Sequence, residues 1–315
     1  MKGAPQMISF VVPVYNGAET IVGVVDEIRH EFKGETIEIV LVNDGSQDTS
    51  EAVCQKLHED DPSRITFVHL ARNFGEHGAT LAGLRHAKGE FIAILDDDSQ
   101  HPPAEVRSML ATLRRDNVDV VFGRYRRKRH TFLRNLGSRF NDRMANWMLN
   151  KPRDLYLSSF KVMNRFLVDE ITRYEGPFPY IDGLILRSTS SFGQVDVEHR
   201  DRQQGRSGYT LRKLVSLWLN MFLNFSITPL RLSALLGVAM AGLSLLLLAG
   251  IVIDKLYFNP DLTHGLPTVL ALIVFFAGLQ LVILGTIGEY IGRLFLDQTK
   301  MPQCVVRYVR SASAE

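Results

Sequence analysis

The chain has 315 residues, of which 46% are hydrophobic and 22% are charged, and its 36 lysines and arginines nearly balance its 34 aspartates and glutamates. A formal net charge of +2 excludes a protein whose main partner is nucleic acid, because such proteins carry a strongly basic surface. The two cysteines, Cys54 and Cys304, lie far apart without a Cys-x-x-Cys motif, so the sequence supports neither a disulfide framework nor a cysteine-based zinc site, and a reducing compartment fits. This length suffices for one large domain or two modest ones.

Short apolar runs alternate with segments of helical periodicity through the first part of the chain. Strands are predicted at residues 8–15, 37–42, 65–70, 91–95 and 118–122, and helices at residues 18–32, 49–58, 77–87 and 103–115. This alternation predicts right-handed crossovers and a mostly parallel sheet with helices on both faces. Ligands of such sheets bind beyond the carboxyl ends of the strands, so we expect Asn16, Asp44 and the acidic residues at 96–98 along one rim.

Three adjacent carboxylates, those of Asp96, Asp97 and Asp98, directly follow the fourth predicted strand. They repel one another unless they are solvated or bound to a cation. Oxygen ligands of this kind suit Mg²⁺ or Mn²⁺, and Mg²⁺ is commonly held by one or two carboxylates together with substrate phosphates. With Gln100 two residues further on, the motif predicts a divalent-metal site, and a solvated acidic turn is the alternative.

A basic stretch follows the fifth predicted strand. No acidic residue occurs between Val120 and Asn141, whereas seven arginines and lysines do. Arg124 and Arg134 are the candidates for bidentate phosphate contacts, and the others would form a solvated face or contact anionic lipid. A second basic group, at residues 200–209, would suit a flexible loop that closes over an anionic substrate.

Two long uncharged segments lie near the C-terminus, at residues 232–253 and 265–288. Each is long enough to cross the roughly 30 Å hydrocarbon layer as a helix, and two buried helices of a soluble core are the alternative. Basic residues flank the pair, at Arg231 and Arg293, whereas the predicted tip carries a single lysine. The positive-inside rule then predicts that both termini and the first domain face the cytoplasm.

The segment at residues 209–228 repeats apolar side chains at helical spacing, with Arg212 and Lys213 near its start. This pattern suits an amphipathic helix in the membrane interface, with Trp218 at headgroup depth. Packing against the soluble domain is an equally acceptable interpretation.

Several motifs together resemble glycosyltransferase family 2, whose members are inverting enzymes of the GT-A fold. They are Val11-Val12-Pro13-Val14-Tyr15-Asn16, Asn43-Asp44-Gly45-Ser46 and Asp96-Asp97-Asp98-Ser99-Gln100. Three more motifs are similar to the dolichol-phosphate mannose synthase branch and its bacterial relatives, which glucosylate or aminoarabinosylate undecaprenyl phosphate. These are Arg72-Asn73-Phe74-Gly75, Arg202-x-x-Gly205-x-Ser207 and Gly288-Glu289-Tyr290-Ile291-Gly292-Arg293.

The resemblance implies roles for particular residues. Nucleotide contacts are implied for Pro13, Tyr15, Asn16, Asp44, Asp96 and Asp97. A Mg²⁺ or Mn²⁺ ion that bridges the donor diphosphate is implied at Asp96, Asp98 and Gln100. Catalytic or phosphate-binding roles are implied for Asp96, Asp98, Arg124, Arg134, Ser138, Arg202 and Ser207. The roles of Asp154, Asp182 and His199 stay open.

Three positions depart from the family pattern. Position 17 is Gly where the family often has Glu, and position 97 is Asp where Ala is usual. The basic loop commonly has Lys after its serine, and this chain has Gly208.

We therefore expect four segments: a cytoplasmic GT-A domain (residues 1–208), an interfacial amphipathic helix (209–229), two transmembrane helices (230–293) and a cytoplasmic tail (294–315). The expected function is inverting transfer of one sugar from a nucleotide sugar to a polyprenyl phosphate, with undecaprenyl phosphate as the expected carrier, for cell-envelope glycan synthesis or modification. The expected location is the bacterial inner membrane, with a homo-oligomer possible.

Three alternative functions differ from this expectation in testable ways. A processive polysaccharide synthase would carry a Gln-x-x-Arg-Trp motif, and neither tryptophan, Trp147 or Trp218, follows an arginine. A non-catalytic, membrane-anchored nucleotide-sugar or lipid-binding protein would not need an intact acidic motif. A small transporter would need more polar residues within its spans than Gln280 and Thr286 provide.

Overall fold

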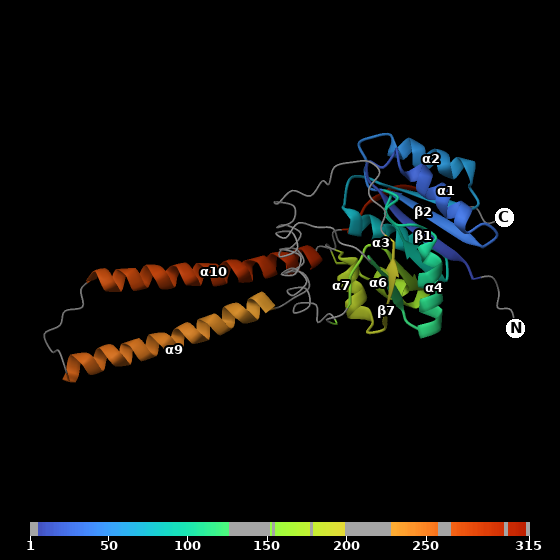
Figure 1. Ribbon diagram of the computed structural model, residues 1–315. Helices are drawn as coiled ribbons and strands as arrows, with labels where there is room; N and C mark the ends of the chain where they lie inside the picture. Colours follow the sequence, from blue (N-terminus) through green and yellow to red (C-terminus); the bar gives the residue numbers. More distant parts are fainter. Residues whose placement is uncertain are drawn as a thin grey trace. The chain divides into compact units, whose positions relative to one another are not determined.

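The computed structural model describes residues 6–125, 152, 155–176, 179–198, 228–257, 266–298 and 302–312. The chain divides into two units, one of residues 1–210 with 300–315 and the other of residues 211–299. Figure 1 labels the described helices of both units and three of the strands, β1, β2 and β7.

The first unit is built on an eight-stranded sheet in the order β7-β5-β6-β4-β1-β2-β3-β8. Its strands are β1 (Ile8–Val14), β2 (Ile37–Asn43), β3 (Ile65–Leu70), β4 (Phe91–Ile94), β5 (Val120–Tyr125), β6 (Lys161–Asn164), β7 (Phe192–Val197) and β8 (Val306–Arg310). The pairs of β1 with β2 and β4, of β2 with β3, and of β5 with β7 are parallel, whereas β6 and β8 are antiparallel to their neighbours. The prediction of a mostly parallel α/β sheet is therefore confirmed.

Six helices accompany the sheet in the described part of this unit (Figure 1). They are α1 (Ile21–Glu31), α2 (Ser50–Asp60), α3 (Glu76–His86), α4 (Glu105–Asp116), α6 (Arg165–Thr172) and α7 (Ile181–Ser188). The helix α4 shows why they form: Val106, Met109, Leu110 and Leu113 recur at helical spacing and are all buried. It ends at Asn117, whose φ of 48° is the left-handed conformation that commonly terminates helices.

The helix α3 packs closely on the sheet because Gly83 faces the strands. A Cβ atom on Gly83 would lie 2.5 Å from Val11 Cγ1 and 2.9 Å from Val42 Cγ2. The helix follows β3 after a short connection, so its first residues lie at the rim where the parallel strands end. This approach brings Glu76 and His77 to that rim.

The strand β8 was not predicted from the sequence. It pairs with the edge strand β3, and the Tyr308 ring lies 5.8 Å from Phe67 and 5.0 Å from His69. The Tyr308 hydroxyl donates a hydrogen bond to Glu51 (2.9 Å). A chain segment expected only as a tail thus covers one edge of the sheet, which would otherwise expose unpaired backbone groups.

The second unit contains two long helices that contact each other, α9 (Thr228–Tyr257) and α10 (Leu266–Gln298). Within α10, the stretch Phe275–Gly292 has a mean hydropathy of 1.4 and no buried residue, so by length and composition it is a candidate membrane span. Among the described residues it is the one stretch that meets these criteria, and the predicted pair of spans stays a prediction. The predicted interfacial helix lies almost entirely outside the described residues.

Candidate active site

The polar residues predicted to share one rim do meet there. The strands β1, β2 and β4 run parallel, and their last residues lead directly into Tyr15, Asp44 and the acidic turn. The backbone N–H of Tyr15 donates to Asp97 Oδ2 (3.1 Å), which links the end of β1 to the turn after β4. The backbone N–H of Asp44 donates to the Val14 carbonyl (2.9 Å), which links the ends of β1 and β2.

The loop after β1 is fixed by the Asn16 side chain. Asn16 Oδ1 accepts the backbone N–H of Gln47 (2.8 Å), and the Asn16 N–H donates to Ser46 Oγ (3.0 Å). Its φ of 55° lies in the left-handed region, which asparagine tolerates better than most residues. Tyr15 is 46% exposed and Pro13 is half-buried on β1. The nucleotide contacts predicted for these three residues stay predictions.

The Asp44 carboxylate is buried and joins β2 to the start of α3. Its Oδ1 accepts the backbone N–H of Phe74 (2.7 Å), and its Oδ2 accepts that of Gly75 (2.9 Å). Burial raises the pKa of Asp44, and the two N–H donors oppose that rise. Its first visible role is therefore to hold the rim together, and a direct nucleotide contact stays a prediction.

The three carboxylates of the acidic turn have different partners. Asp96 Oδ2 accepts the Ser159 hydroxyl (3.1 Å), Asp97 faces β1, and Asp98 Oδ1 accepts the Gln100 N–H (3.2 Å). Separate partners reduce the repulsion that three adjacent negative charges create.

The structure links two of the departures from the family pattern. A Cβ atom on Gly17 would lie 2.3 Å from Asp97 Oδ2, so a side chain at position 17 would displace the Asp97 carboxylate. The Asp97 carboxylate thus fills the space that a side chain at position 17 would need. In this arrangement the Asp97 carboxylate requires glycine at position 17, whereas the usual family pair places the carboxylate at position 17. The third departure, Gly208, lies outside the described residues.

His101 contacts the acidic turn through the backbone of Asp96, and the sequence analysis did not single it out. It is 3% exposed, and its ring stacks on Phe160 with centroids 4.9 Å apart. Its Nδ1 accepts the backbone N–H of Asp96 (3.2 Å), so Nε2 carries the proton and donates to the Tyr125 hydroxyl (2.7 Å). Burial raises the pKa of Tyr125 to about 12, so the phenol stays neutral. In the sequence, the position of His101 five residues after Asp96 was the one feature that could have suggested this supporting role.

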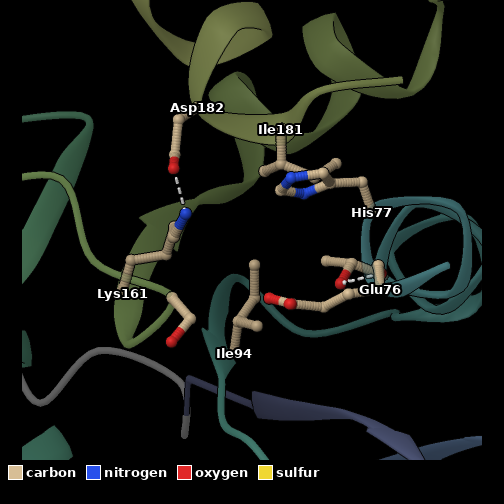
Figure 2. Close-up of a pocket in the computed structure, with 8 residues that line it drawn as sticks. Glu76, His77, Ile94, Lys161, Ile181 and Asp182 are labelled. Carbon is tan, nitrogen blue, oxygen red and sulfur yellow. Dashed lines mark hydrogen bonds and ion pairs between the residues drawn. The ribbon is translucent and has the colours of Figure 1, made fainter. Parts of the chain in front are cut away.

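A cavity of about 90 Å³ lies beside the acidic turn (Figure 2). It is lined by Glu76, His77, Thr80, Ile94, Ser159, Lys161, Ile181 and Asp182. The Lys161 ammonium donates to Asp182 Oδ1, and both residues are buried, at 3% and 9% exposure. Ser159 belongs to the wall and also binds Asp96, so the cavity and the acidic turn share a side chain.

Protein surroundings shift the proton affinities of the groups in this wall. The pKa of Glu76 is raised, first by desolvation and then by the nearby charge of Asp96. The pKa of His77 is lowered by desolvation, and its ring meets that of Tyr180 edge to face at 5.0 Å. Sequence analysis left the role of Asp182 open and missed Glu76 and Lys161, because nothing in the sequence shows that they converge.

Arg124 lies at the end of β5 and is paired with Asp196 of β7. Its Nε is 2.5 Å from Asp196 Oδ1, its side chain is 53% exposed, and the carboxylate raises the pKa of the guanidinium. The predicted phosphate contact of Arg124 stays a prediction. The other candidates lie outside the described residues: Arg134, Ser138, Asp154, His199, Arg202 and Ser207.

The donor set of the acidic turn fits a divalent cation. Asp96, Asp98 and Gln100 bring two carboxylates and an amide oxygen into one short turn, which is the oxygen chemistry that Mg²⁺ and Mn²⁺ take. Within the described residues, no three side chains of His, Cys, Asp or Glu form a cluster that could hold a metal ion. A cation here would therefore need further oxygen ligands, such as those of a diphosphate.

Comparison with known proteins agrees with this architecture. The sequence model of the family described as Glycosyl transferase family 2 matches residues 9–172. The chain is 30% identical, over 307 residues, to an undecaprenyl-phosphate 4-deoxy-4-formamido-L-arabinose transferase of Enterobacter sp. (strain 638), covering 96% of this chain and 94% of the relative. It is also 30% identical to the transferase of the same name from Yersinia pestis (strain Pestoides F), covering 97% and 94%.

Among solved structures, the chain is similar in fold to glucosyl-3-phosphoglycerate synthase of Mycobacterium tuberculosis. The TM-score is 0.51 at 19% identity, covering 69% of this chain and 76% of that one, and that crystal structure contains Mn²⁺, UDP and phosphoglyceric acid. The chain belongs to glycosyl transferase family 2. The predicted GT-A fold class and the predicted enzyme class, a glycosyltransferase, are thereby confirmed.

Proposed function

We propose that this protein transfers one sugar from a nucleotide-sugar donor to a polyprenyl phosphate, with undecaprenyl phosphate as the carrier. The observation that carries the proposal is the 30% identity to undecaprenyl-phosphate sugar transferases, which extends over 96% of the chain and therefore includes both units. The product would be a lipid-linked monosaccharide for cell-envelope glycan synthesis or modification.

The acidic turn is the proposed site for the donor diphosphate. Asp96, Asp98 and Gln100 would hold a Mg²⁺ or Mn²⁺ ion, which when bound neutralises charge on the departing nucleoside diphosphate. The crystal structure of the M. tuberculosis neighbour contains Mn²⁺ together with UDP, which supports the use of a divalent ion. The hydrogen bond that Ser159 donates to the Asp96 carboxylate and the one that the Asp96 backbone N–H donates to His101 would keep Asp96 in place while the donor binds.

The acceptor chemistry requires alignment more than deprotonation. The second pKa of a phosphate monoester is about 6, so its oxygen is largely ionised at neutral pH and needs no strong general base. The chain would hold this oxygen in line with the anomeric carbon while basic side chains, Arg124 among them, offset the phosphate charges. A single displacement of this kind inverts the anomeric configuration.

A membrane location would bring the enzyme to its lipid acceptor. Large apolar side chains are exposed along both long helices, for example Leu235 and Leu246 of α9 and Leu281 and Leu284 of α10. A soluble protein would bury such surfaces, whereas lipid tails accept them. We propose that residues 232–253 and 265–288 form a two-span hairpin in the bacterial inner membrane. The positive-inside rule places the glycosyltransferase unit and both termini in the cytoplasm.

The test is a transfer assay with the full chain in lipid nanodiscs. Undecaprenyl phosphate and a panel of labelled nucleotide sugars are supplied with Mg²⁺, with Mn²⁺ or with a chelator. The expected result is one lipid-linked monosaccharide of inverted configuration, formed only with a divalent ion. Long glycan chains would instead indicate a processive synthase, and a retained configuration would exclude the single displacement. Binding of donor without any transfer would indicate the non-catalytic alternative.

A further inference from the structure

The cavity of Figure 2 adjoins the proposed donor site without belonging to its metal or nucleotide contacts. It is lined by the first residues of α3 and α7, by the last residue of β4 and by the start of β6. The hydrogen bond from Ser159 to Asp96 joins its wall to the acidic turn. A sugar attached to a diphosphate at the acidic turn would therefore lie next to its opening.

The size of the cavity limits what can enter. A water molecule occupies about 30 Å³ in the liquid, so about 90 Å³ has room for roughly three non-hydrogen atoms. A whole sugar ring with its substituents is too large. A ring held outside could send one substituent in, and a substituent of three atoms would fill the space.

The wall offers an acceptor on one side and a donor on the other. Figure 2 shows Glu76 and Lys161 approaching the cavity from opposite sides. The Glu76 carboxylate accepts no hydrogen bond from the described residues, although protein surrounds it closely enough to raise its pKa. Lys161 gives one hydrogen bond to Asp182, and an ammonium group has three to give.

These features select among sugar substituents. A neutral amide satisfies both walls, because its N–H can donate to Glu76 while its carbonyl accepts from Lys161. A hydroxyl places a single atom in the cavity and leaves the rest to water. A protonated amine would pair with Glu76 but would face the Lys161 ammonium.

We propose that this cavity receives an acylamino substituent of formamide size on the donor sugar, and that Glu76 and Lys161 determine this specificity. The inference rests on the proposed function, since it assumes that a nucleotide sugar binds at the acidic turn. A formamido group also stands in the name of the transferases that resemble this chain. What the structure adds is the assignment of two side chains, Glu76 and Lys161, to the recognition of this group.

The experiment measures donor selectivity by binding, without the lipid acceptor. Full-length protein in nanodiscs with Mn²⁺ is titrated calorimetrically with 4-deoxy-4-formamido-L-arabinose and with L-arabinose, each linked to UDP and, in parallel, to GDP. The wild type is expected to bind the formamido sugar at least about tenfold more tightly. The affinity ratio is the affinity for the formamido sugar divided by that for L-arabinose. The E76Q variant keeps the shape of the side chain and the Lys161–Asp182 pair but removes the charge of Glu76, so this ratio should fall by about tenfold. The E76A variant should lower the ratio further.

The matched control is Glu90→Gln, an exposed carboxylate that precedes β4 and so lies at the opposite end of that strand from the cavity. Its affinity ratio should equal that of the wild type. Equal affinity of the wild type for both sugars, an unchanged ratio in E76Q, or no binding of any donor would overturn the inference. Transfer to undecaprenyl phosphate is assayed on the same samples. Selective binding without transfer would refute the proposed function alone, and transfer without selectivity would refute the cavity assignment alone.

Discussion

Replacing Lys161 by methionine tests whether the buried ion pair of the cavity wall holds the first unit together. The Lys161 ammonium and the Asp182 carboxylate join β6 to α7, and both side chains are largely removed from water. Removing one partner leaves an uncompensated charge in a poorly solvated place. Breaking a buried pair in this way typically costs about 3–5 kcal/mol.

The loss can be followed as a change in melting temperature. For a unit of this size, 1 kcal/mol shifts the melting temperature by about 2–4 °C, so K161M should melt about 6–20 °C below the wild type. The assay is thermal unfolding of the full chain in nanodiscs, followed by circular dichroism. The matched control is R173M, which breaks an exposed pair with Glu170 and should cost less than about 1 kcal/mol.

A second variant separates a lost pair from lost packing. The double substitution K161M/D182L removes both charges together, and replacement of a buried pair by apolar residues of similar volume is often neutral. It should therefore melt much closer to the wild type than K161M does. The electrostatic reasoning is wrong if K161M has the same melting temperature as the wild type. It is also wrong if the double variant melts at the same temperature as K161M or below it.

Three further predictions concern the rim. In the G17A variant the new Cβ would overlap Asp97 Oδ2, so the free energy of unfolding, measured with denaturant, should fall by about 1–3 kcal/mol. The double variant G17A/D97A should recover most of this stability. A double variant as unstable as G17A would contradict the proposed overlap. D98A should lower metal-dependent transfer at least about 100-fold in the lipid-transfer assay and leave membrane insertion intact, whereas the surface variant D116A should transfer normally. Folding raises the pKa of Asp44 above its usual value of 3.8, so the folded protein holds this proton more tightly than the unfolded chain does. Protonation of Asp44 therefore stabilises the fold at a pH below 3.8, and this contribution is lost as the pH rises through the folded-state pKa. The stability of the wild type relative to D44N should therefore fall from pH 3.5 to pH 7, and a rise over that range would show the opposite shift.

Local sequence patterns predicted the framework of the first unit. The apolar runs that became β1 to β5 and the periodic segments that became α1 to α4 carry their signal within a few residues, because strand and helix periodicities are local properties. The rule that parallel strands share a carboxyl edge then sufficed to place Asn16, Asp44 and the acidic turn on one rim.

Contacts between distant segments could not be predicted in the same way. The antiparallel insertion of β6 between β4 and β5 brings Lys161 into the sheet, and α7 brings Asp182 to it. The pairing of β8 with β3 joins residues more than two hundred positions apart. Sequence periodicity does not predict such long-range contacts, because they depend on how the whole chain packs.

The sequence by itself therefore determined the class of fold, the polar rim and the apolar character of the C-terminal helices, since each follows from short-range pattern or composition. Only the tertiary structure decided that Glu76, Lys161 and Asp182 line one cavity, that Asp97 fills the space beside Gly17, and that Asp44 is buried. These facts depend on distances between side chains that folding alone brings together.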